Sequence, residues 1–195
     1  IILILLILGQ CSIKNEQSEW ETIFNGKNLD GWTVKIKGYP TGDNFGNTFK
    51  VADEAIQVSY ENYDNFDFKF GHIYYTEKKY KNYHLKLEYK FFGNQAIGGE
   101  GWATKNSGIM FHSQHPETML IDQSFPVSLE AQFLGGLGDG KRPTGNLCTP
   151  GTDVDIDFEK VKSHCTQSSS ETYHSDDWVK AEIIVYNDSI AHHII

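Results

Sequence analysis

The chain has 195 residues, a length typical of one domain, with a formal net charge of −9 and a pI near 5.3. No segment resembles a basic stripe, so the composition argues against a nucleic-acid partner and favours neutral or cationic ligands. Aromatic residues make up 13% of the chain and there are 18 glycines, a combination that fits turn-rich β structure.

The chain opens on an apolar segment, residues 1–8, that is too short to span a bilayer and leads into Cys11. This order predicts a partial secretory signal over residues 1–11 that ends at a lipidated cysteine, followed by a polar tether over residues 12–19. Gln10 departs from the small residue expected before such a cysteine, so an ordinary cleaved signal is the alternative. Both predict export across the inner membrane, and lipidation predicts a periplasmic or cell-surface lipoprotein that touches the membrane only through its lipid anchor.

Segments with strand patterns follow, separated by Gly, Asn and Asp. Their apolar residues alternate or run together over 55–59, 72–76, 83–92, 107–113, 126–134 and 178–186. One short helical turn is expected, over 157–162, and no long stretch has helical periodicity. The pattern predicts an all-β antiparallel β-sandwich over residues 20–195. Residues 191–195 end inside an expected strand, so we expect the sandwich to be truncated at its C-terminus.

Two other local patterns suggest loops. The glycine-dense segments 98–101 and 135–140 do not match a phosphate-binding loop, and we expect them to be rims of a cleft or plain connections. The acidic run 153–157 fails the EF-hand pattern, because Phe158 stands where glycine is needed and His164 where glutamate belongs.

The cysteine count predicts one disulfide. With Cys11 assigned to the anchor, Cys148 and Cys165 remain as an even pair in an oxidising compartment. A metal pair or free thiols are the alternatives, but the chain has no Cys-x-x-Cys unit and export disfavours both.

Polar residues on one predicted strand are the strongest candidates for a binding site. Within 126–134 the two-residue period places Ser128, Glu130 and Gln132 on one face and apolar residues on the other. A carboxylate beside a carboxamide supplies acceptors and donors for sugar hydroxyls, and the carboxylate can also move a proton. The alternative is an ordinary solvated sheet face.

Two further titratable residues are catalytic candidates. Glu88 shares a face with Lys86 and Lys90, and it is either a solvated partner of lysine or, beside Glu130 on a concave sheet, half of a carboxylate pair. His112 suits a base, a sugar donor or a metal ligand, with a structural histidine as the alternative.

Arg142, Thr144 and Asn146 follow the second glycine-rich segment. A guanidinium there would suit a developing oxyanion or a sugar hydroxyl, and the alternative is stabilisation of the loop through turns and capping. Trp102 would stack on a pyranose ring or fill the core.

The order and spacing of several motifs resemble the 3-keto-disaccharide hydrolase family of bacterial secreted proteins, formerly a domain of unknown function, over about residues 20–195. The motifs are residues 24–32, 102–112, 125–136, 142–152, His164-Cys165 and 173–179. The resemblance implies a concanavalin A-like jelly roll.

The resemblance also implies a chemistry. When the 3-hydroxyl of a glucoside has been oxidised to a ketone, the hydrogen at C2 is acidic, so a base can remove it while the aglycone leaves from C1, and water adds to the enone. Glu130 or His112 is the expected base. The residues expected to bind the glycoside or oligosaccharide are Trp102, Asn106, Gln132, Arg142, Thr144 and Asn146. No cofactor is demanded by a spacing motif, although His112 and Glu130 could together hold a divalent metal.

Two rival functions follow from the same fold class. A conventional glycoside hydrolase would use Glu88 and Glu130 as its two carboxylates and cleave unoxidised glycosides. A carbohydrate-binding module would bind sugar without turnover, since sandwiches host both kinds of protein.

Overall fold

The computed structural model describes residues 20–174 and 178–195. The expected signal, tether and lipidated Cys11 lie outside the described residues, as does the middle of the motif at 173–179. The described part is all-β with antiparallel pairings, as predicted, and its helical segments are single 3₁₀ turns: η1 (Phe45–Asn47), η2 (Gly101–Ala103) and η3 (Pro116–Thr118). No helix in that part is long and apolar enough to cross a membrane.

The strands form two larger sheets and three two-stranded ones. The strands are β1 (Trp32–Ile36), β2 (Phe49–Ala52), β3 (Ala55–Val58), β4 (Gly71–Tyr75), β5 (Asn82–Tyr89), β6 (Asn106–Phe111), β7 (Leu129–Leu134), β8 (Asn146–Cys148), β9 (Asp155–Ile156), β10 (Glu159–Lys160), β11 (Cys165–Thr166), β12 (Val179–Tyr186) and β13 (Ile190–Ile194). The four-stranded sheet has the order β11-β8-β7-β6 and the three-stranded sheet the order β13-β12-β5. The remaining pairs are β1-β4, β2-β3 and β9-β10.

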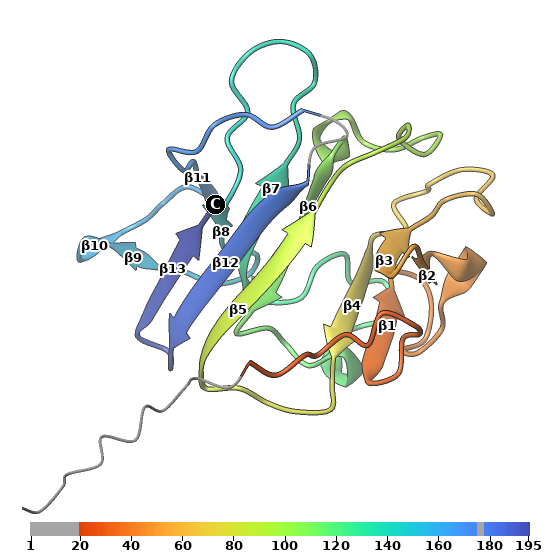
Figure 1. Ribbon diagram of the computed structural model, residues 1–195, viewed down its shortest axis with the longest axis horizontal. Coiled ribbons are helices and arrows are strands. Elements are labelled where there is room, and N and C mark those ends of the chain that lie inside the picture. Colours follow the sequence, from red (N-terminus) through yellow and green to blue (C-terminus); the bar gives the residue numbers. More distant parts are fainter. Residues whose placement is uncertain (1–19, 175–177) are drawn as a thin grey trace, which may run out of the picture.

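The two larger sheets pack face to face, with the three-stranded sheet in front of the four-stranded one in Figure 1. Their shared core consists of four buried side chains, two from each sheet: Phe111, Ala131, Ile183 and Val185. At one end of this core the ring of Tyr89 stacks on Phe133, with centroids 4.2 Å apart and planes 5° apart. Alternate residues of each strand supply these groups, as the two-residue period requires.

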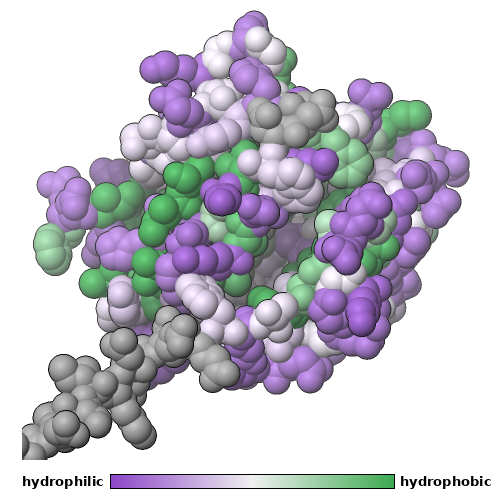
Figure 2. All heavy atoms as spheres, viewed as in Figure 1, coloured by the Kyte–Doolittle hydropathy of each residue, from purple (hydrophilic) through white to green (hydrophobic). Residues whose placement is uncertain are grey.

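A second core joins β1-β4 to β2-β3 at the side of the sandwich (Figure 1) and is centred on Val34, Ile36 and Phe49. Figure 2 shows this side of the molecule hollowed between the three-stranded sheet and β1-β4. On the other face of β1, Lys35 is 2% exposed, and its Nζ donates to the carbonyls of Ile36, Tyr39 and Ile121 at 2.9 to 3.3 Å. The bond to Ile121 fastens the connection between β6 and β7 to β1.

The six predicted strand segments all contain observed strands, with ends displaced by at most three residues. β6 ends at Phe111 because His112 has a φ of 49°, in the left-handed region. The helical turn expected over 157–162 is wrong. Asp157 and Phe158 both have positive φ, 51° and 66°, and they form the two-residue turn of a hairpin between β9 and β10.

The predicted disulfide is present. Cys148 on β8 is bonded to Cys165 on β11, and the two residues are also directly opposite each other in the strand register, with a Cα–Cα distance of 4.1 Å. The bond therefore fastens the edge strand β11 to its neighbour β8 within the four-stranded sheet.

We expect the double variant C148S/C165S to lose about 3 kcal/mol of unfolding free energy, because the disulfide removes loop-closure entropy from the unfolded chain. Urea denaturation with and without reductant measures this. Reductant should lower the midpoint of the wild type and leave that of the double variant unchanged. Equal midpoints for the oxidised wild type and the double variant would contradict the expectation.

Candidate functional site

Alternate residues of β6, β7 and β8 form the outer face of the four-stranded sheet, on the side away from the shared core. The strand register arranges them in two neighbouring rows across the sheet. These rows are Met110–Glu130–Cys148 and Gly108–Gln132–Asn146. The outer face therefore places a carboxylate, two carboxamides and a thioether next to each other, with the disulfide at one side.

Glu130 is the titratable group of this face. Burial raises the pKa of its carboxyl to about 7, and no other side chain contributes to the shift. Among the described residues no donor pairs with this carboxylate, and no unpaired side-chain oxygen there is fully enclosed. The Glu130 oxygens therefore stay accessible to a ligand, and the group exchanges a proton near neutral pH, as a general acid or base must.

Gly108 provides the space that the Glu130 side chain occupies. A Cβ atom at position 108 would lie 2.5 Å from Oε1 of Glu130 and 2.8 Å from the carbonyl oxygen of Ala131. Both contacts are shorter than van der Waals separation. The absence of a side chain at Gly108 is therefore a condition for the observed position of the carboxylate.

Asn146 orients Gln132. The Asn146 side chain is 3% exposed, and its Nδ2 donates to Oε1 of Gln132 at 3.1 Å and to the carbonyl of Pro143 at 3.0 Å. Its Oδ1 accepts from the backbone N–H of Ser168 at 3.0 Å. Because the Gln132 oxygen is engaged, its Nε2 is the end that can donate to a ligand. Asn146 thus acts through Gln132.

Asn106 continues the outer face along β6, two residues from Gly108, and it is opposite Leu134 in the register. Its Nδ2 donates to the carbonyl of Trp102 at 3.2 Å. Trp102 lies in η2 and is 55% exposed, so it does not fill the core. The structure therefore brings Asn106 and Trp102 together at one end of the outer face.

Arg142 and Thr144 hold the loop instead of facing outward with Glu130. The Arg142 guanidinium donates to the carbonyls of Gly135 (2.5 Å), Thr104 (2.7 Å) and Lys105 (3.3 Å), and burial lowers its pKa. Thr144 has no exposed surface. Its hydroxyl bonds to the Tyr89 hydroxyl at 2.6 Å and accepts from the backbone N–H of Leu134 at 3.1 Å. These contacts match the loop-stabilising alternative for both residues.

Glu88 is not beside Glu130, which corrects the expected carboxylate pair. Glu88 alternates along β5 with Tyr89, whose ring lies in the core, so it projects from the outer face of the three-stranded sheet. There it is exposed and opposite Lys180 in the register. The core of the sandwich separates the two carboxylates.

His112 is exposed and follows the end of β6, with its ring 5.5 Å from the Phe111 ring. The positive φ interrupts the alternation that would have placed it with Met110 and Glu130. Among the residues that the structure describes, no three His, Cys, Asp or Glu side chains converge as a metal site would require.

The sequence pattern did not single out Gly108, Met110 or the position of the disulfide beside Glu130. All three are placed there by the pairing of β6 with β7 and of β7 with β8. The only available signal was the alternation within 107–113, which gives a face for Gly108 and Met110 but no cross-strand partner.

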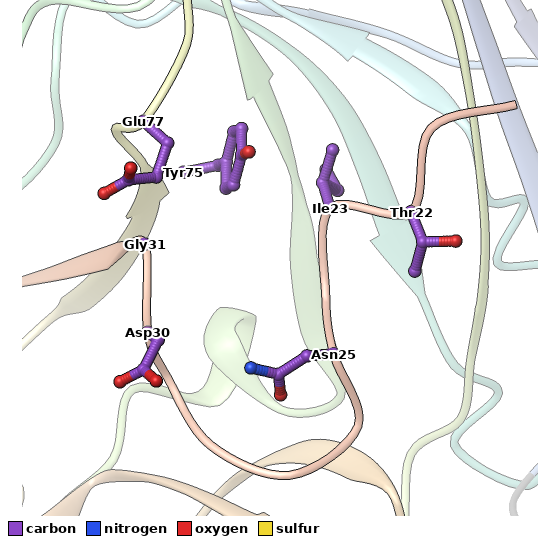
Figure 3. Close-up of a pocket in the computed structure, with 7 residues that line it drawn as sticks. All are labelled: Thr22, Ile23, Asn25, Asp30, Gly31, Tyr75 and Glu77. Carbon is purple, nitrogen blue, oxygen red and sulfur yellow. The ribbon is translucent and has the colours of Figure 1, made fainter.

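A separate open pocket of about 310 Å³ lies between residues 22–31 and the end of β4 (Figure 3). Its lining residues are Thr22, Ile23, Asn25, Asp30, Gly31, Tyr75 and Glu77, none of which was a predicted site residue. The Tyr75 ring reaches into the space between the two segments (Figure 3). Asn25 and Asp30 are engaged with Asn28 in the turn that shapes this pocket.

The raised pKa of Glu130 predicts a pH-dependent gain of stability in the variant E130Q. Above the unfolded-state pKa of about 4.3, folding must keep a proton on Glu130 or bury its charge, so the wild type loses stability as pH rises towards 7. Glutamine has no such cost. The unfolding free energy of E130Q relative to the wild type should therefore rise by at most about 4 kcal/mol between pH 4.3 and 7. Above about pH 7 the difference should level off.

Urea denaturation at several pH values between 4 and 8.5 measures this difference. E88Q is the matched control, because the Glu88 carboxylate is exposed, and its stability relative to the wild type should stay nearly constant. A flat difference for E130Q would show that the Glu130 pKa is not raised.

Comparison with protein families supports the sequence resemblance. A family model described as the 3-keto-alpha-glucoside-1,2-lyase-like domain matches residues 19–195, nearly the whole chain. Searches of curated proteins and of solved structures gave no match. Because the family match includes all the strands and the complete outer face around Glu130, the chain belongs to the 3-keto-alpha-glucoside-1,2-lyase-like family.

Proposed function

We propose that this protein cleaves 3-keto-glycosides by removing the C2 proton and eliminating the aglycone, followed by hydration. The observation that carries the proposal is Glu130, an accessible carboxyl group whose pKa is raised to about 7 on a polar sheet face. Family membership supports the substrate class, since the family description names a 3-keto-glucoside and a lyase-like activity.

In the proposed reaction the Glu130 carboxylate takes the C2 proton, the electrons of the C2–H bond form a C1–C2 double bond, and the C1–O bond breaks. The leaving oxygen takes a proton, for which protonated Glu130 is the acid on this face. Negative charge develops on the 3-keto oxygen during proton removal. The Nε2 of Gln132, oriented by Asn146, is the donor proposed for that oxygen. Addition of water to the enone returns hydrogen to C2 and hydroxyl to C1.

His112 is the second candidate for the base, after Glu130. Its positive φ interrupts the alternation of β6 that would have placed its side chain on the outer face. Among the described residues no third His, Cys, Asp or Glu side chain joins His112 and Glu130 in a metal-binding group, so no step here is assigned to a divalent metal. For location, we propose an exported lipoprotein anchored through Cys11, with a small glycoside or oligosaccharide as its ligand.

The separation of Glu88 from Glu130 removes the residue pair on which a conventional glycoside hydrolase would depend. A binding module without catalysis remains the rival. It would use the same carboxamides and Trp102 for sugar, but it gives no reason for a half-buried carboxyl group that receives no hydrogen bond from the described residues.

The proposed function is tested by incubating the protein with a nitrophenyl 3-keto-glucoside and with the unoxidised glucoside, each with and without chelator. Release of nitrophenol from the keto form alone is expected. Release from the unoxidised glucoside would support a hydrolase that does not require the ketone, and sugar binding without any release would support the binding module. Loss of release with chelator would show that a metal takes part.

E130Q should lower kcat for the keto-glucoside by about 10² to 10⁴-fold, the usual contribution of a positioned acid or base. In the wild type, kcat/KM should rise with pH and level off above about 7, because the base must be ionised. E88Q should retain full activity. Full activity in E130Q, with its fold verified by circular dichroism, would eliminate Glu130 as the base.

A further inference from the structure

Trp102 presents one open aromatic face. Its ring stacks on Phe70, with centroids 5.6 Å apart and planes 25° apart, and Phe125 lies 6.3 Å away at 56°. The side chain is nevertheless 55% exposed. A tryptophan that is covered on one face and exposed on the other offers a large, flat apolar surface to a ligand.

The turn that carries Trp102 is held in place. Gln95 donates to the carbonyl of Glu100 at 2.6 Å and accepts from the Thr104 hydroxyl at 2.7 Å, so it braces both ends of η2. Asn106 donates to the carbonyl of Trp102 itself, and Arg142 donates to that of Thr104. Because the backbone of the turn is held and the ring is stacked on Phe70, little conformational entropy remains to be lost when a ligand stacks on Trp102.

The outer face of β6 connects Trp102 to the candidate site. Asn106, Gly108 and Met110 alternate along this face, and Met110 is opposite Glu130. The path from Asn106 to Met110 is four residues, or about 13 Å of extended strand. The residue at the middle of this path is Gly108, which has no side chain. The path from the Glu130 carboxylate to Asn106 is therefore not blocked by a residue of β6.

We propose that the open face of Trp102 is a stacking platform for the second pyranose ring of a disaccharide whose oxidised ring is bound at Glu130. Pyranose rings have apolar C–H faces that pack on aromatic rings, while their hydroxyls bond to groups such as the Asn106 carboxamide. The platform selects substrates with a sugar aglycone over those with a small one. This inference rests on the proposed function.

The test compares kcat/KM for a 3-keto-maltose and for methyl 3-keto-glucoside in the wild type, W102A and W102F. W102A should lower kcat/KM for the disaccharide about 10-fold, which corresponds to about 1.4 kcal/mol, and that for the methyl glycoside less than twofold. W102F should recover part of the loss. An equal loss for both substrates would overturn the platform.

W178A is the matched control. Trp178 is 53% exposed, directly before β12, and Lys90 lies over its ring at 4.9 Å. Since Val179 points into the core, Trp178 belongs to the opposite side of the sandwich from Glu130. W178A should leave the ratio of kcat/KM between the two substrates unchanged. A change in that ratio as large as the one caused by W102A would overturn the proposal. Thermal melting verifies that each variant folds.

A failure of the proposed function is distinguishable from a failure of the platform. If the wild type cleaves neither substrate, unoxidised maltose is titrated while the indole N–H signals are followed by NMR. A shift of one indole signal that is absent in W102A would keep the platform as a sugar site. No shift of the signal assigned to Trp102 would overturn it.

Discussion

The antiparallel register of β6, β7 and β8 is the constraint on which the site depends. It determines that Glu130 lies between Met110 and Cys148 and that Gln132 lies between Gly108 and Asn146. A slip of one residue in β7 would send Glu130 into the core and Ala131 to the outer face. The buried Ala131 and Phe133 oppose such a slip, so packing on one face of the strand positions the chemistry on the other.

Desolvation of Glu130 has opposite effects on stability and on function. The burial that raises its pKa makes ionisation in the folded state costly, and no described side chain offsets that cost with a hydrogen bond. Elsewhere among residues 20–174 and 178–195 the fully buried polar side chains are paired, as for Lys35 with its carbonyls and Thr144 with Tyr89. An unpaired carboxyl in an otherwise satisfied structure is the pattern expected where reactivity is retained at the expense of stability.

The sequence predicted β3 to β7 and β12, the faces of β7 and the cysteine pairing, because alternation and cysteine count are local or countable properties. It missed β1, β2 and the short strands β8 to β11. It did not predict which strands pair. The face of β5 that carries Glu88 was therefore predicted correctly, but the prediction that Glu88 lies beside Glu130 was wrong. Alternation cannot show which side of a sandwich a face occupies. Arg142 and Thr144 were assigned to ligand binding for their chemistry, yet backbone groups of other segments engage them. Such long-range partners follow only from the folded chain.

Glycine has different physical roles in the segments around the site. At Gly98 and Gly99 a Cβ atom would lie within 3 Å of the side chains of Asn65 and Gln95, so these glycines permit close packing, and Gly98 also has a positive φ of 73°. In the second segment Gly135 and Gly136 are also closely packed, against Phe91 and His174. Of that segment's glycines, only Gly138 and Gly140 have positive φ angles with nothing near the missing Cβ, so those two glycines serve the turn alone. The first segment leads into the braced turn of Trp102, and its glycines thus contribute to a fixed surface. Glycine content by itself had suggested a cleft rim or a plain connection for both, and only the packing around each residue separates the two roles.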